Sequence, residues 1–104
     1  MNTKARSDAR KFLERLRGGP LTFGRMLASI RRADEVVQAD LARRMGISRA
    51  RLCDIENGRR AVTVEGAAQF ARVLGYSVNQ FVAVAVEDQL RKAGLKVRVR
   101  LEAA

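Results

Sequence analysis

Histidine and tryptophan are absent from this sequence of 104 residues, and cysteine and proline each occur once. Without histidine, the chain lacks the most common general base and metal ligand. A single cysteine excludes both an intramolecular disulfide and a cysteine-based zinc site. No apolar run approaches the roughly 18 residues of a membrane-spanning helix, and no apolar stretch typical of a signal peptide follows the first residues. We therefore expect a cytoplasmic protein that is not an enzyme and holds no metal or cofactor.

Acidic residues are few compared with basic ones. The sequence has 11 Asp and Glu against 21 Lys and Arg, which gives a net charge of +10, and most of this excess lies in residues 1–60. Such a charge on one small domain favours a polyanionic partner, with nucleic acid ahead of an anionic membrane. Only 5% of the residues are aromatic, so the platforms that stack unpaired RNA bases are missing. The expected partner is double-stranded DNA, with no membrane.

Breakers and caps divide the chain into three parts. Pro20 follows two glycines and marks a hinge, so we expect a basic N-terminal arm at 1–20, a folded domain at 21–94 and a tail at 95–104. Within the domain, capping residues precede apolar stripes of helical spacing, and glycines follow them. The pattern predicts an all-α fold of five helices: roughly 23–33, a second ending at Gly46, Ser48 to Gly58, Thr63 to Gly75, and Ser77 to about Ala93.

The fifth predicted helix is more apolar than one buried face requires. Residues 81–86 are β-branched enough for a strand, but Ser77 before them and Gly94 after them bracket a length that suits a helix. We expect a second copy of the chain to bury the excess apolar surface in a homodimer. The predicted contact residues are Phe81, Val82, Val86 and Leu90.

The segment 95–101 alternates apolar and basic residues, which is the pattern of a half-buried strand. Nothing else in the chain resembles a strand, and a single strand has no ladder partner. We expect this strand to pair with another molecule, with Val97 and Val99 contacting the second copy of a homodimer, or else to remain loose.

The stretch from Gln38 to Arg60 carries the functional signal. Two predicted helices are joined by Gly46-Ile47-Ser48, a turn too short for antiparallel packing, in which the glycine takes a positive φ and the isoleucine fills the corner. Ala42 is small enough to let the two helices approach closely. This arrangement is a helix-turn-helix, whose second helix is built to enter a DNA major groove.

Residues 22–76 resemble the phage-repressor-like helix-turn-helix family (Cro/CI, or XRE), because the run Q-x-x-L-A-x-x-x-G-I-S-x-x-x-L-x-x-I-E-N-G-x-R is nearly complete. Val37 departs from the family's usual Ser or Thr, which weakens the cap of the second helix. The resemblance implies a buried structural ion pair between Arg31 and Glu56. It also implies base-reading positions at Arg49, Ala50 and Asp54, with Arg51 to one side, and phosphate contacts at Gln38, Ser48, Asn57, Arg59 and Arg60.

The base-reading positions have chemistry that suits their expected roles. Arg49 fits guanine O6 and N7, Ala50 fits a thymine methyl group, and Asp54 can accept from cytosine N4. In the alternative interpretation, Asp54 only orients Arg49 or Arg51. In a further alternative, three arginines do not contact DNA and only solvate their helix faces: Arg43, Arg44 and Arg51.

The chain also resembles helix-turn-helix antitoxins of bacterial toxin–antitoxin operons, particularly the HigA type, in its size, last helix, arm and tail. We predict a nucleoid-associated, sequence-specific, dimeric transcriptional repressor that is also an antitoxin and represses its own operon. Its arm would then present an apolar face to the cognate toxin. A stand-alone regulator with no toxin is the alternative, with the arm only adding nonspecific DNA affinity. The arm residues concerned are Phe12, Leu13 and Leu16.

Overall fold

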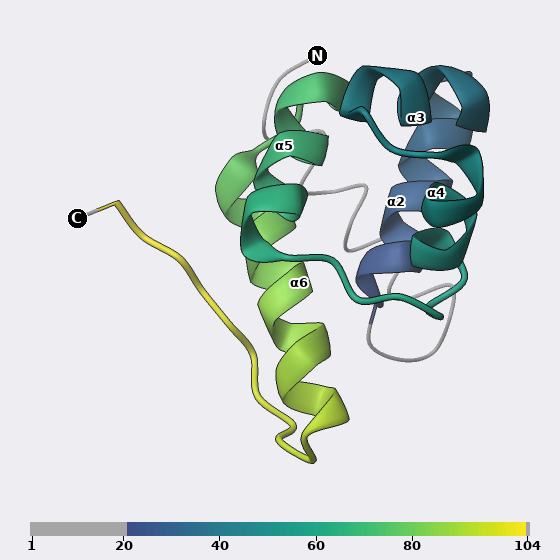
Figure 1. Cartoon of the computed structure of the whole chain (residues 1–104). Coiled ribbons are helices and arrows are strands. Elements are labelled where there is room, and N and C mark those ends of the chain that lie inside the picture. The colour runs from purple at the N-terminus through teal and green to yellow at the C-terminus, as the bar shows by residue number, and fades with distance from the viewer. Residues whose placement is uncertain (1–20, 104) are drawn as a thin grey trace.

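The computed structural model describes residues 21–103, and this part of the chain folds into helices alone (Figure 1). The predicted all-α fold of five helices is confirmed. Two groups of helices define the layout: α5 packs along α6, and beside them α4 packs against both α2 and α3. The helices are α2 (Phe23–Ala33), α3 (Gln38–Met45), α4 (Arg49–Glu56), α5 (Val64–Leu74) and α6 (Val78–Lys92).

Local capping chemistry explains where these helices begin and end. The hydroxyls of Thr22, Ser48, Thr63 and Ser77 each accept a hydrogen bond from the backbone N–H three residues later, which satisfies one of the free donors of a first helical turn. As the sequence predicts, Val37 at the N-cap position before α3 provides no side-chain cap. Two helices end in left-handed glycines, Gly46 at φ 70° and Gly75 at φ 80°, the conformation that glycine adopts without steric cost.

The core lies where α2, α5 and α6 meet, and small and aliphatic side chains fill most of it. Three phenylalanines link these helices: the ring of Phe23 lies 6.1 Å from that of Phe70 and 5.9 Å from that of Phe81, centroid to centroid. Leu41 of α3 and Leu52 of α4 are fully buried against the same cluster. The core therefore ties α3 and α4 to the rest of the domain.

Gly24 lets α2 approach the end of α4 at backbone distance. A Cβ atom at this position would overlap the carbonyl oxygen of Ile55 and lie 2.8 Å from that of Glu56. Because those atoms belong to the backbone, no side-chain rotation can relieve the overlap. The absence of a side chain here sets how α4 is held against the domain.

Two of the predicted dimer contacts are wrong. Phe81 and Val82 are 2% and 8% exposed and belong to the domain's own core. The prediction underestimated how much of α6 its own domain covers, because α6 contacts both α5 and α2. Val86 and Leu90, further along α6, are only half-buried.

The predicted strand at 95–101 does not form in the single chain. Residues 95–103 leave α6 as a segment without helix or strand (Figure 1), since a lone strand finds no ladder within a helical domain. Val97 is 52% exposed, and Val99 is half-buried. No helix in the described part of the chain is both long and apolar enough to cross a membrane. The arm at 1–20, with Phe12, Leu13 and Leu16, lies outside the described residues.

Candidate nucleic-acid interface

A three-residue turn sets the angle between α3 and α4. Gly46 is left-handed, and the N–H of Ile47 donates to the carbonyl of Ala42 over 3.0 Å. Ala42 is buried, and Ile47 packs against the core from the corner between the helices. With Leu52 and Ile55 facing the interior, α4 turns Arg49, Ala50 and Arg51 toward solvent.

A buried ion pair locks the end of α4 to α2. Arg31 Nε donates to Glu56 Oε2 over 2.7 Å, and Arg31 Nη2 donates to Oε1 over 3.0 Å. The side chains are 9% and 3% exposed, and Arg31 Nη1 also donates to the carbonyl of Val36. These hydrogen bonds with the carboxylate raise the pKa of Arg31, so the guanidinium stays charged despite its burial. The ion pair implied by the family resemblance is confirmed.

Gln38 connects this ion pair to the exposed face of α4. Its Nε2 donates to Glu56 Oε1 over 2.9 Å, and its Oε1 accepts from Arg49 Nε over 3.4 Å. Arg49 is thereby held by its inner nitrogen. Its two terminal nitrogens make no hydrogen bond within residues 21–103. The sequence indicated a phosphate contact at Gln38 but not this link.

Asp54 is paired with the loop that follows α4. Arg59 Nε donates to Asp54 Oδ1 over 2.9 Å, and the backbone N–H groups of Arg59 and Arg60 donate to the Asp54 carbonyl. This carboxylate raises the pKa of Arg59, chiefly through the hydrogen bond. The alternative in which Asp54 orients Arg49 or Arg51 gains no support, since within residues 21–103 its carboxylate hydrogen-bonds to Arg59 and to neither of these two. It positions the loop instead.

Of the other polar residues around α4, some form hydrogen bonds or ion pairs within the domain and one forms no ion pair in residues 21–103. Asn57 Nδ2 donates to the carbonyl of Cys53 over 2.9 Å and so closes the last turn of α4. Arg43 and Arg44 both pair with Asp40 on α3, which favours the interpretation that they solvate that helix. Arg60 is exposed and has no ion-pair partner in the part of the chain that the structure describes.

Comparison with known proteins agrees with the helix-turn-helix geometry described above. The family described as "Helix-turn-helix domain" matches residues 22–81, more than half of the chain. The chain belongs to the helix-turn-helix family. The structure is also similar to the clp gene regulator ClgR from Corynebacterium glutamicum, with a TM-score of 0.55 and 29% sequence identity over 69% of this chain and 77% of that chain. No curated protein matches the sequence.

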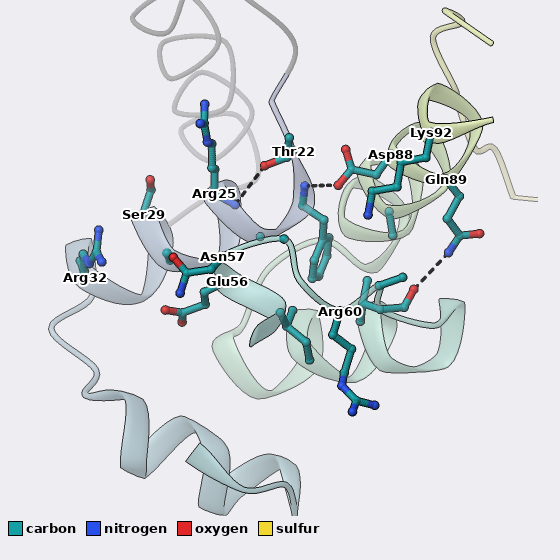
Figure 2. A pocket seen from close by; sticks show the side chains of 18 residues that line it. Thr22, Arg25, Ser29, Arg32, Glu56, Asn57, Arg60, Asp88, Gln89 and Lys92 are labelled. Atoms are coloured by element: carbon teal, nitrogen blue, oxygen red, sulfur yellow. Dashed lines mark hydrogen bonds between the residues drawn. The ribbon is translucent and has the colours of Figure 1, made fainter. Parts of the chain in front are cut away.

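Beside the helix-turn-helix, the structure reveals three basic residues that the sequence reasoning missed, Arg25, Arg32 and Lys92, in the lining of a cavity that Arg60 also reaches. This cavity of about 580 Å³ lies between α2, the loop after α4 and α6, and Figure 2 shows the side chains around it. Its acidic lining residues are engaged within the fold: Glu56 binds Arg31, and Asp88 accepts from the N–H of Phe23 and pairs with Arg91. The cavity is therefore cationic, with Arg25, Arg32, Arg60 and Lys92 in its lining.

A sequence signal for two of these residues existed. Arg25 and Arg32 are seven positions apart on α2, which places them two turns apart on one helix face. Lys92 gave no such signal, because only the packing of α6 against α2 brings it to the same cavity.

Proposed function

We propose that this chain is a DNA-binding transcriptional regulator that reads its DNA site with α4. The observation that carries this proposal is the exposed N-terminal half of α4, where Arg49, Ala50 and Arg51 face solvent. The helix is held from behind by the buried pair Arg31–Glu56. A rigid helix with an exposed face of this kind is what the major groove accepts.

Within this proposal, three side chains read base edges. The terminal nitrogens of Arg49 donate to guanine O6 and N7, and Ala50 contacts a thymine methyl group. Asp54 Oδ1 accepts from Arg59, whereas Oδ2 makes no hydrogen bond in the described residues. In the DNA complex proposed here, Oδ2 accepts from cytosine N4. Arg51 lies at the edge of the same face.

Phosphate contacts surround this reading face. The backbone N–H groups of Arg49 and Ala50, in the first turn of α4, lack helical partners, and a phosphate oxygen accepts from them. The Ser48 hydroxyl beside them already accepts from the N–H of Arg51. Gln38 Nε2 carries a second N–H beyond the one it gives to Glu56. The loop after α4 supplies Asn57, Arg59 and Arg60, which contact the backbone of the duplex.

The regulator acts as a homodimer in this proposal. Val86 and Leu90 lie one turn apart on α6 and are only half-buried, so a second copy can cover them. In this dimer, a two-fold axis through the α6 contact relates the two α4 helices. Such a dimer reads an inverted repeat whose half-sites are one helical turn apart, about 34 Å.

Selection from random duplexes with the full chain tests both parts of this proposal. We expect enrichment of an inverted repeat with half-site centres about 10 base pairs apart, and sedimentation at micromolar concentration should give a dimer. Enrichment of a single half-site by a monomer would contradict the dimer alone. Absence of any enriched sequence would contradict sequence-specific binding.

We further propose that the regulator is the antitoxin of a toxin–antitoxin operon and represses that operon. Support comes from the arm, where Phe12, Leu13 and Leu16 have helical spacing ahead of a glycine hinge. A regulator needs no apolar arm to bind DNA, whereas an apolar groove on a toxin accepts such a face. The competing function is a stand-alone regulator with a basic arm.

Deleting residues 1–19 distinguishes these two functions. The experiment pairs the chain with a small basic protein encoded in the same operon and measures growth rescue and operator binding. Lost rescue with unchanged operator binding is the expected result, because the apolar face is removed while α4 is intact. Intact rescue with weaker and less salt-dependent DNA binding would show that the arm only adds nonspecific affinity.

A further inference from the structure

The segment Leu95–Leu101 exposes large apolar side chains in an extended stretch. Leu95 and Val97 are each 52% exposed and Leu101 is 39% exposed, which makes three of the five exposed large hydrophobic residues in the described chain. Basic residues alternate with them, at Lys96, Arg98 and Arg100. Two of these already have acidic neighbours, since Arg98 Nε lies 4.0 Å from Glu87 Oε1 and Arg100 Nε lies 3.5 Å from Glu102 Oε1. An extended chain with this alternation has one apolar and one cationic face.

One edge of this segment faces its own domain. The N–H of Val99 donates to Glu87 Oε1 of α6 over 2.8 Å. In an extended chain, the backbone groups of alternate residues point to opposite edges. The N–H and C=O groups of Lys96 and Arg100 therefore point to the other edge, away from Glu87, and they make no hydrogen bond within residues 21–103. At Lys96 and Arg100 that edge is open to a further strand.

A second copy of the segment is a poor occupant of this edge. Antiparallel pairing of all seven residues places Arg98 opposite its copy and Lys96 opposite Arg100, and like charges directly opposite each other destabilise a sheet. Shifting the register to bring Glu102 opposite Arg98 still leaves Arg100 opposite its copy. The shift also removes Leu95 from the pairing. In these two registers, which keep most of the segment paired, the charges argue against the self-pairing that the sequence alone suggested.

We propose that residues 95–101 add as a strand to the exposed sheet edge of another protein whose edge strand alternates apolar and acidic side chains. Main-chain hydrogen bonds from the open edge supply the pairing, as in other cases of strand addition. Acidic side chains then lie opposite Lys96, Arg98 and Arg100, and the apolar face joins that of the partner sheet. This inference is independent of how α4 reads DNA.

A charge-reversed copy of the chain serves as the acidic probe. The variant K96E/R98E/R100E keeps the apolar face of the segment and places three glutamates opposite the three cations of the natural chain. Isotope-labelled natural chain is titrated with the unlabelled variant while the amide signals of residues 95–101 are followed by NMR. We expect saturable shifts and cross-strand contacts, with an affinity at least tenfold higher than for added natural chain and weakened several-fold by 0.5 M salt.

The matched control is R25E/R32E/R72E, which carries the same change in net charge on exposed helix positions and leaves the segment unchanged. Equal shifts with this control would overturn the proposal, because they would reflect general attraction between charged molecules. Absence of shifts with the acidic probe would overturn it as well. If residues 95–101 of two natural chains paired as tightly as with the probe, the result would overturn the proposal and support strand pairing within a homodimer. Operator binding, measured in parallel, reports on α4 separately.

Discussion

Replacing Arg31 by methionine is expected to lower the free energy of unfolding by about 3–5 kcal/mol. The substitution leaves the Glu56 carboxylate, only 3% exposed, without its cation in the interior. The carbonyl of Val36 also loses its donor. Removing one member of a buried pair is costly because the remaining charge has neither water nor a partner. Urea unfolding followed by circular dichroism measures the change.

Two further variants show whether burial is the cause. Asp40→Asn breaks the more exposed pairs with Arg43 and Arg44 and should change stability by no more than about 1 kcal/mol. The double variant R31M/E56M removes both charges and should recover much of the loss, because apolar side chains of similar size replace a buried pair well. A loss below about 1 kcal/mol for Arg31→Met would contradict the buried role.

Replacing Arg49 by alanine is expected to weaken binding to the selected DNA site by about 1–3 kcal/mol, or roughly 5- to 150-fold. The loss should be concentrated at one base pair, where the variant accepts other bases. The reason is geometric: Arg49 is held through Nε by Gln38, so its terminal nitrogens are presented together for a bidentate contact. Repeating the duplex selection with the variant measures the relaxed position.

Arg59→Ala is the matched comparison, since it removes an exposed arginine of the same domain. It should weaken binding to all sequences about equally and reduce the salt slope by about one, as expected for a phosphate contact. An Arg49→Ala variant that keeps the full sequence preference of the natural chain would contradict the assignment of α4 as the reading helix.

The helices of this protein could be predicted from the sequence because their signals are local. A hydroxyl at the cap acts within one helical turn and placed the starts of α2, α4 and α5 correctly. The glycines Gly58 and Gly75 marked where α4 and α5 end. The turn between α3 and α4 was also predictable, since Gly46 alone supplies the left-handed conformation. The ion pair Arg31–Glu56 came from the family resemblance, not from any local pattern.

The tertiary structure decided what depends on contacts between distant segments. Apolar periodicity shows that Phe81 and Val82 are covered but not by what, and only packing shows that their own domain covers them. Likewise, the pairing of Asp54 with Arg59 and the link from Gln38 to Arg49 depend on where α4 ends relative to α3. The segment 95–101 has the alternation of a strand, but strand formation requires a neighbouring strand. Within residues 21–103 the segment instead contacts a helix, α6, through the N–H groups of Leu95 and Val99 and the ion pair of Arg98 with Glu87. A helix satisfies its backbone from within, whereas a strand depends on another segment to complete it.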